Sequence, residues 1–148
     1  MKRLMTSFRL LTSTFAMSLA MVPAWAQSAP AAASAPALSL ELNTAQPSEK
    51  GCRLTFVVNN ALGADLSKAA FEIALFNEAG VVDRLTVLDF KDLPAGKTKV
   101  TRFDLAGADC GKLSRVLINS ATECAGVEPA ACMRALKTST RTAIAFGV

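Results

Sequence analysis

The chain has 148 residues with 16 Lys and Arg, 12 Asp and Glu, no histidine and no tyrosine. Without histidine, acid–base catalysis by imidazole and metal sites that contain histidine are excluded. Three of the cations lie in the first 26 residues, which hold no acid, so 13 cations and 12 anions remain beyond them; this near balance argues against a nucleic-acid partner.

Residues 1–26 have the layout of a secretory signal peptide. A basic start containing Lys2 and Arg3 precedes an apolar stretch from Leu10 to Val22, and Ala24-Trp25-Ala26 matches a small-x-small cleavage site. The apolar stretch is too short to span a bilayer, which takes roughly 17–25 residues. We therefore expect cleavage after Ala26, no membrane span afterwards, and a periplasmic or secreted protein. Lys2-Arg3 is not a twin-arginine pair, which favours the ordinary secretion route.

Cleavage would also remove Trp25, the only tryptophan. Stacking of sugar rings on Trp or Tyr is therefore excluded, and phenylalanine supplies all the remaining aromatic rings. Residues 27–37, QSAPAAASAPA, have the composition of a linker. Residues 38–148 are long enough for one domain with a modest core.

From Leu38 onward, apolar and polar residues mostly alternate, which is typical of half-buried strands. The pattern predicts seven strands at 38–43, 52–58, 71–76, 81–90, 97–105, 113–119 and 140–146. Turn sequences separate most of them, and residues 128–136 are predicted to form one or two helical turns. The main local alternative is a helix over 64–79, where alanines are frequent.

Seven short strands with turns between them predict an all-β fold, an antiparallel immunoglobulin-like β-sandwich. A small barrel is the alternative arrangement.

Four cysteines remain in a compartment that oxidises thiols, so we expect two disulfides. Cys52, Cys110, Cys124 and Cys132 allow three pairings. Because successive antiparallel strands alternate in direction, Cys52 and Cys110 fall at one end of the sandwich and Cys124 and Cys132 at the other. We therefore predict the pairs Cys52–Cys110 and Cys124–Cys132. The cysteine spacings lack C-x-x-C, which argues against a redox motif or a zinc site.

Other polar residues are interpreted as structural. The acids Asp83, Asp89, Asp92, Asp104 and Asp109 lack the spacing of a calcium-binding loop and are expected to be turn residues. Three serines have no histidine partner: Ser114, Ser120 and Ser139. We predict no catalytic residue, no metal ligand and no cofactor.

Two further groups have structural and functional interpretations. Asn59-Asn60 and Asn119 are expected at strand ends, where asparagine tolerates turn geometry. Lys97, Lys99 and Arg102 form a basic stretch, either an edge charged against strand pairing or a contact for an anionic partner.

Several turn and cysteine motifs between Cys52 and Phe146 resemble a known family. They are Gly51-Cys52, Phe76–Gly80, Leu93–Thr98, Phe103–Leu105, Arg115–Asn119 and the cysteines that follow. The sequence resembles small exported bacterial proteins labelled "Tat pathway signal sequence domain protein", and more loosely the immunoglobulin-like domains of FxLYD type. The resemblance implies a fold and brings no catalytic residues. It also implies a twin-arginine signal, from which Lys2-Arg3 departs.

These observations favour a non-enzymatic binding or accessory module that acts through protein contacts in the cell envelope, with an unknown envelope protein as partner. The alternative is a small secreted inhibitor of a hydrolase that uses the Cys124–Cys132 loop as a wedge. An enzyme that uses only carboxylates comes third. A deep pocket with two converging acids would favour the enzyme, a protruding braced loop the inhibitor, and an exposed edge strand a partner that adds a strand.

Overall fold

The computed structural model describes residues 35–148, so the predicted signal peptide and most of the predicted linker lie outside the described residues. The described part consists of strands with one short α-helix and one 3-10 turn. The strands are β1 (Ala37–Ser48), β2 (Gly51–Ala61), β3 (Leu66–Asn77), β4 (Val82–Leu93), β5 (Thr98–Ala106), β6 (Leu113–Ala125), β7 (Leu136–Thr140) and β8 (Ala145–Gly147). The 3-10 turn is η1 (Cys110–Lys112), and the helix is α1 (Pro129–Ala135).

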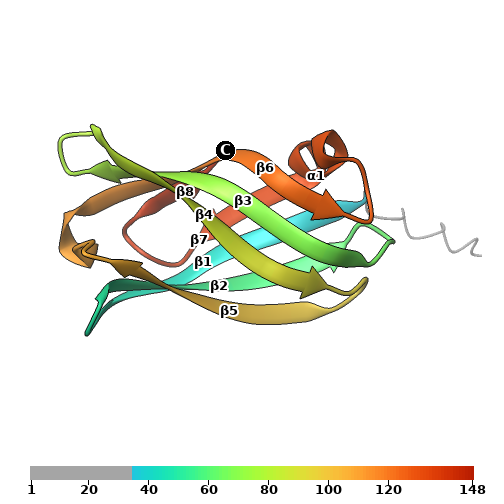
Figure 1. Cartoon of the computed structure of the whole chain (residues 1–148), viewed down its shortest axis with the longest axis horizontal. Helices are drawn as coiled ribbons and strands as arrows, with labels where there is room; N and C mark the ends of the chain where they lie inside the picture. Colours follow the sequence, from blue (N-terminus) through green and yellow to red (C-terminus); the bar gives the residue numbers. More distant parts are fainter. Residues whose placement is uncertain (1–34) are drawn as a thin grey trace, which may run out of the picture. The chain divides into compact units, whose positions relative to one another are not determined.

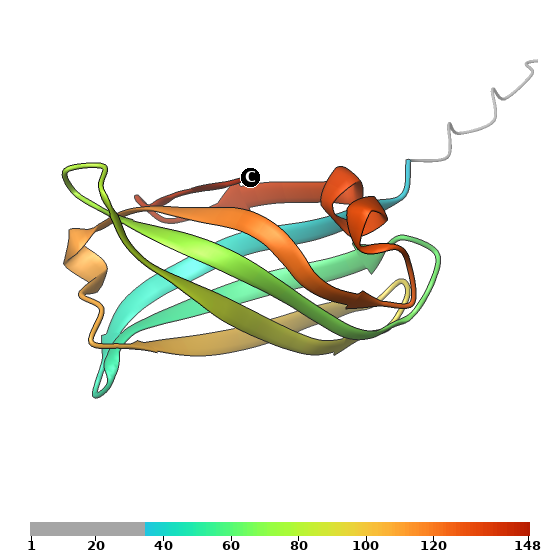
Figure 2. The same ribbon diagram turned by 45° about the horizontal axis from the view of Figure 1, so that its top comes forward.

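Two four-stranded sheets pack face to face, as Figures 1 and 2 show. Sheet A has the order β5-β2-β1-β7, and sheet B has the order β4-β3-β6-β8. The predicted all-β sandwich is confirmed, with eight strands in place of about seven. The alternative of a helix over 64–79 is wrong, because alternate residues of β3 such as Phe71, Ile73 and Leu75 are buried, which fits a strand with one face on the core.

The end of the chain departs from the prediction. The prediction of a single strand at 140–146 is wrong. The structure has two strands there: β7 pairs parallel with β1 in sheet A, and β8 pairs parallel with β6 in sheet B. Between them the chain crosses from one sheet to the other. The Arg141 N–H donates to the Leu42 carbonyl at 3.0 Å, and the Thr142 hydroxyl oxygen accepts from the Ile144 N–H at 3.1 Å. Ile144 lies between two alanines and is buried at this crossing, where the chain bends and belongs to neither strand.

Several strands are longer than predicted because they continue through polar residues. β6 passes Asn119 at a bulge, where the Asn119 side-chain amide donates to a Glu72 carboxylate oxygen on β3 at 2.6 Å. A bulge lets one extra residue leave the ladder without ending the strand. The predicted helical turns at 128–136 correspond to α1, which ends where β7 begins at Leu136.

The core lies between the sheets and is built from the alternating apolar residues. Phe56 of β2 is 1% exposed, and its ring lies 5.4–6.0 Å from three other phenyl rings. Those rings are Phe90 on β4, Phe103 on β5 and Phe146 on β8. The phenylalanine cluster therefore joins both sheets.

The β3–β4 hairpin gives a test of turn chemistry. Gly80 has φ +74°, in the left-handed region that favours glycine, and a Cβ there would meet open space. Gly80→Ala is therefore expected to lower the free energy of unfolding by about 1 kcal/mol through backbone strain. Gly111→Ala is the matched control, because Gly111 has no positive φ. Urea unfolding followed by circular dichroism measures both, and equal losses would contradict the expectation.

Candidate functional site

The four cysteines form the two predicted disulfides. Cys52 at the start of β2 is bonded to Cys110 of η1, and Cys124 in β6 is bonded to Cys132 of α1. Cys52, Cys124 and Cys132 are almost fully buried. The bridges lie at opposite ends of the sandwich, as strand direction predicts. They act as staples, because each holds a short segment, η1 or α1, against a strand.

Asn60 is the buried polar residue of the core, at 1% exposure. Its side-chain amide donates to the carbonyls of Ala64 at 2.9 Å and Leu93 at 2.7 Å, and its Oδ1 accepts from the Leu62 N–H at 3.0 Å. Its own carbonyl accepts from the Gly96 N–H at 2.7 Å. Asn60 thus joins the β2–β3 loop to the β4–β5 turn. The expectation that Asn60 lies at a strand end is confirmed, since Asn60 is the last residue but one of β2. Its burial in the core was not predicted.

The five aspartates that were considered as calcium ligands do not form a common site. Four of them pair with a nearby cation: Asp83 with Arg84, Asp89 with Lys91, Asp92 with Lys99, and Asp104 with Arg53. Asp109 instead accepts from the Gly111 N–H and caps η1. Among residues 35–148, no three His, Cys, Asp or Glu side chains come together as metal ligands would.

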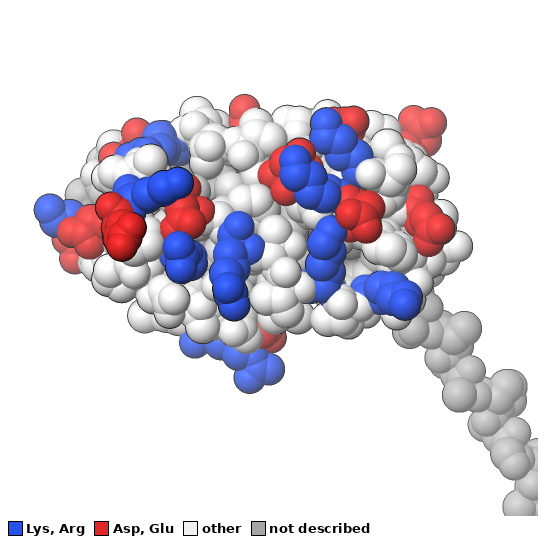
Figure 3. Space-filling view, turned by 60° about the horizontal axis from the view of Figure 1, so that its bottom comes forward, with Lys and Arg blue, Asp and Glu red and all other residues white. Residues whose placement is uncertain are grey.

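The side chains of the basic stretch at the start of β5 do not all lie on one face. The Lys99 ammonium reaches back to β4, where it donates to the Phe90 and Asp92 carbonyls and pairs with the Asp92 carboxylate at 3.1 Å. Arg102 is exposed opposite Thr55 in the sheet A ladder. Figure 3 shows basic and acidic side chains interspersed over this side of the domain. The stretch therefore forms no single cationic patch.

Of the three serines considered above, Ser114 has a structural contact. The Ser114 hydroxyl donates to the Asn77 carbonyl at 2.5 Å. Ser120 lies on β6 in sheet B and Ser139 on β7 in sheet A, so the three serines are not gathered at one place.

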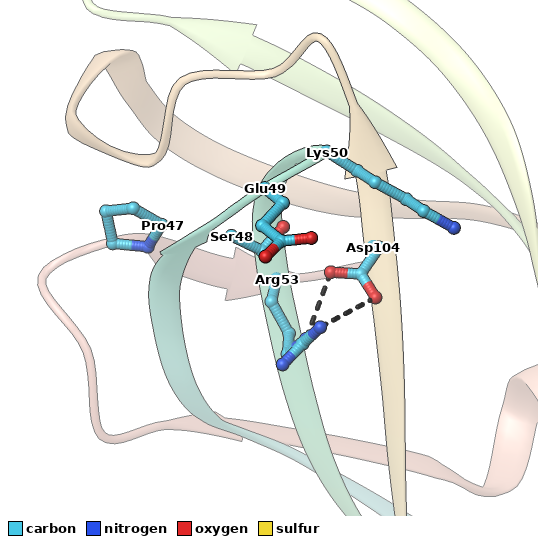
Figure 4. A pocket seen from close by; sticks show the side chains of 6 residues that line it. All are labelled: Pro47, Ser48, Glu49, Lys50, Arg53 and Asp104. Atoms are coloured by element: carbon cyan, nitrogen blue, oxygen red, sulfur yellow. Dashed lines mark hydrogen bonds and ion pairs between the residues drawn. The ribbon is translucent and has the colours of Figure 1, made fainter.

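An open depression of about 630 Å³ lies beside the β1–β2 hairpin (Figure 4). It is lined by Pro47, Ser48, Glu49, Lys50, Arg53 and Asp104. Arg53 binds both carboxylate oxygens of Asp104, at 3.0 and 3.2 Å. This hydrogen bonding, with a further one from Ser48, lowers the pKa of Asp104. Asp104 is thus held as an anion by an arginine and is unsuited to act as a general acid. A second hollow, of about 310 Å³, lies beside the β3–β4 hairpin and η1.

The outer face of sheet B carries a group of apolar side chains that we call the apolar patch. It consists of three exposed residues of β4 and two partly buried residues beside them: Val82, Leu85 and Val87 of β4, Phe76 of β3 and Leu117 of β6. The three β4 residues are 47%, 55% and 50% exposed. Leu85 and Leu117 lie on either side of Ala74 in the ladder. The Arg115 guanidinium lies 5.5 Å from the centre of the Phe76 ring and covers one end of the patch.

The sequence alone gave little sign of this patch. Val82, Leu85 and Val87 read as part of a return strand, and alternation does not say whether such residues face a core or the solvent. The edge position of β4 follows from the strand order, in which β4 has β3 on one side only. Exposed apolar patches of this kind mark contact surfaces more often than isolated apolar residues do.

The charged pairs govern the expected response to pH. Side-chain hydrogen bonds lower the pKa of Glu41 (from Asn43, then Arg141), Asp89 (from Lys91) and Asp92 (from Lys99), and a hydrogen bond to Glu123 raises the pKa of Lys68. Lys68 and Asp92 are exposed and Glu41 and Asp89 are partly exposed, so each contributes little to stability.

The free energy of unfolding is therefore expected to stay level from about pH 5 to about pH 9. The carboxylates with lowered pKa stabilise the fold above their unfolded pKa values, and that stabilisation is lost as the pH falls through their folded values. Lys68 stabilises below its unfolded pKa, and its contribution is lost as the pH rises through its folded value. Since no histidine titrates between these limits, urea unfolding at several pH values should show a plateau. A clear slope between about pH 6 and about pH 8 would contradict this account.

Comparisons with known proteins give no family assignment. No protein-family model matches the chain, and no curated protein matches it either. Among solved structures, it is similar to the Salmonella enterica trimeric lipoprotein SadB, with 18% identity and a TM-score of 0.41. The match covers 47% of this chain and 40% of that structure, so the chain spans less than half of the length of that protein.

Proposed function

We propose that this protein is an exported, non-enzymatic binding module with an immunoglobulin-like sandwich, and that it contacts another protein of the cell envelope through the apolar patch of sheet B. The observation that carries the proposal is the exposure of Val82, Leu85 and Val87 along one edge strand. Apolar side chains held half-exposed on a rigid sheet are suited to burial against a partner.

The strand order supports the immunoglobulin-like part of the proposal. β1, β2 and β5 share one sheet and β3 and β6 the other, as strands A, B, E and C, F do in immunoglobulin domains. β7 is an addition to that plan, since it lies beside β1 in parallel. Two disulfides in a domain without a membrane-spanning helix among residues 35–148 support an extracytoplasmic, periplasmic or secreted location.

The alternative as a wedge-type inhibitor gains less support from the geometry. Cys132 of α1 is fully buried, and Met133 packs against the core. The Cys124–Cys132 segment therefore folds onto β6, whereas a wedge would need to project from the domain.

Site-specific photocross-linking tests the proposal. A photoreactive amino acid at Leu85, in the full chain produced and exported by living cells, is expected to give adducts with a distinct envelope protein, identified by mass spectrometry. The same substitution at Val100 is the matched control, because Val100 is 59% exposed but lies on β5 of the other sheet. Adducts at Val100 and none at Leu85, or the same adducts at both positions, would overturn the proposed contact surface.

A further inference from the structure

Among residues 35–148, one acidic side chain within the strands has no basic partner. Six of the seven Asp and Glu residues that lie in strands form an ion pair with Lys or Arg, and the exception is Glu72 in the middle of β3. Its Oε1 atom accepts a hydrogen bond from the Asn119 side-chain amide at 2.6 Å, which leaves the charge of the carboxylate uncompensated. The six paired residues are Glu41, Asp83, Asp89, Asp92, Asp104 and Glu123.

Glu72 lies beside the apolar patch, on the outer face of sheet B. In the ladder it is opposite Val87 of β4. Two positions further along β3, on the same face, Ala74 lies between Leu85 and Leu117. The short side chain of Ala74 is 5% exposed, because the longer leucine side chains flank it. This face therefore combines aliphatic side chains with one negative charge that has no cation among the described residues.

The main chain of this region is not free to pair with another strand. In sheet B, β3 lies between β4 and β6 (Figure 1). On the outer edge of β4, the Asp92 carbonyl accepts from the Lys99 ammonium at 2.8 Å, and the Arg84 guanidinium donates to the Ala106 carbonyl of β5 at 2.8 Å. Charged residues and shifts of register at both ends of the edge also protect it from pairing. A partner therefore contacts the face of sheet B through side chains.

We propose that the apolar patch and Glu72 together bind a segment of the partner protein in which a Lys or Arg is flanked by aliphatic side chains. The inference rests on the proposed function, because it names the chemistry of the partner that the same surface recognises. The basic side chain of the partner pairs with Glu72, and an aliphatic side chain lies over Ala74. Because these two residues are on one face of a strand, they are about 7 Å apart. Residues i and i+2 of an extended segment have that separation.

The size and charge of the surface favour such a segment. Three side chains that are about half exposed offer only a few hundred Å² of apolar area. This is far below the roughly 800 Å² that each partner buries in a stable complex, so a polar contact must add to the binding. A partner that covered Glu72 without a cation would leave a charge with little access to water, which is unfavourable. A basic side chain removes that cost, and an acidic one is repelled.

Selection of binders from a display library of random linear peptides, on the mature, disulfide-bonded protein, tests the proposal. The peptides that contact the patch are those whose binding is weakened by Leu85→Ser. In these peptides Lys and Arg are expected to be enriched at least about threefold over the unselected library. Glu72→Gln is expected to weaken their binding at least about fivefold, because it removes the charge and keeps an oxygen that accepts from Asn119. Circular dichroism checks that this variant is folded.

Glu123→Gln is the matched control for the loss of one negative charge. Glu123 lies on the same face, opposite Ala70, but it is already paired with Lys68 at 2.6 Å. Its substitution should change peptide binding by less than about twofold. Three results would overturn the proposal: patch-binding peptides without an excess of basic residues, equal binding to the two variants, or no peptide that depends on Leu85.

Photocross-linking in cells separates this inference from the proposed function. With the photoreactive amino acid at Leu85, Glu72→Gln is expected to lower the yield of envelope-protein adducts at least about threefold, and Glu123→Gln to leave the yield unchanged. Equal yields from both variants would overturn this inference and leave the proposed function standing. Peptides of the expected chemistry without any adduct in cells would do the reverse.

Discussion

Replacing Asn60 with alanine is expected to lower the free energy of unfolding by about 3 kcal/mol. The Asn60 side chain makes three hydrogen bonds with main-chain groups of Leu62, Ala64 and Leu93. Alanine would leave these groups without partners where water has little access. A buried polar group that loses its partner costs about 1–3 kcal/mol, so partial rehydration of the loop still leaves a large loss.

The substitution Asn60→Asp distinguishes the effect of lost hydrogen bonds from the effect of lost side-chain volume. Aspartate is close to asparagine in size, but an ionised carboxylate cannot donate to the Ala64 and Leu93 carbonyls, so we expect a loss at least as large as for alanine. Asn59→Ala is the control, because the Asn59 side chain is partly exposed and donates to Thr98 Oγ1 at 3.1 Å. We expect it to change stability by less than about 1 kcal/mol. Urea unfolding with both disulfides intact measures all three, and a small loss for both Asn60 variants would contradict the assigned role.

Phe56→Ala is expected to be more disruptive, with a loss of about 4 kcal/mol. The Phe56 ring touches phenyl rings from β4, β5 and β8, so its removal leaves a cavity bordered by both sheets. Deleting a buried phenyl ring costs about 3–5 kcal/mol, with the larger values where the surroundings cannot collapse. The two sheets are each held by their own hydrogen bonds, which limits such collapse.

Phe76→Ala provides the comparison for the core variant. Phe76 is only partly buried and lies on the outer face of sheet B under the Arg115 guanidinium. We expect its truncation to cost about 1 kcal/mol, because the site is already open to water. Denaturant unfolding with the same probe gives both values. Similar losses for Phe56 and Phe76 would show that the phenylalanine cluster does not control stability.

Residues that alternate strictly were read correctly from the sequence. Leu38, Leu40 and Leu42 predicted a half-buried strand, and each is at most 1% exposed. The cysteine pairing was also predictable, since the direction of strands fixes which loops share an end of the sandwich. These predictions depend on period and connectivity, which a sequence contains.

Features that depend on strand order were beyond prediction. Asn60 was placed correctly at the end of a strand, but its burial was not predicted, because its amide binds the carbonyl of Leu93, which is distant in the sequence. The parallel addition of β7 to β1 and β8 to β6 requires a crossing at 141–144 that the alternation concealed. The apolar patch required knowing that β4 is an edge strand, so Leu85 could not be distinguished from a core residue in advance.

The parallel pairing of β1 with β7 has a consequence for the time course of folding. Leu38 of the first strand is registered with Leu136, and the Arg141 N–H donates to the Leu42 carbonyl. Chain closure over such separations is slow, and domains rich in non-local strand pairs fold in milliseconds to seconds. Sheet A is complete only once β7 is present. We therefore expect a chain that is being synthesised from its N-terminus to remain unfolded until β7 has been made.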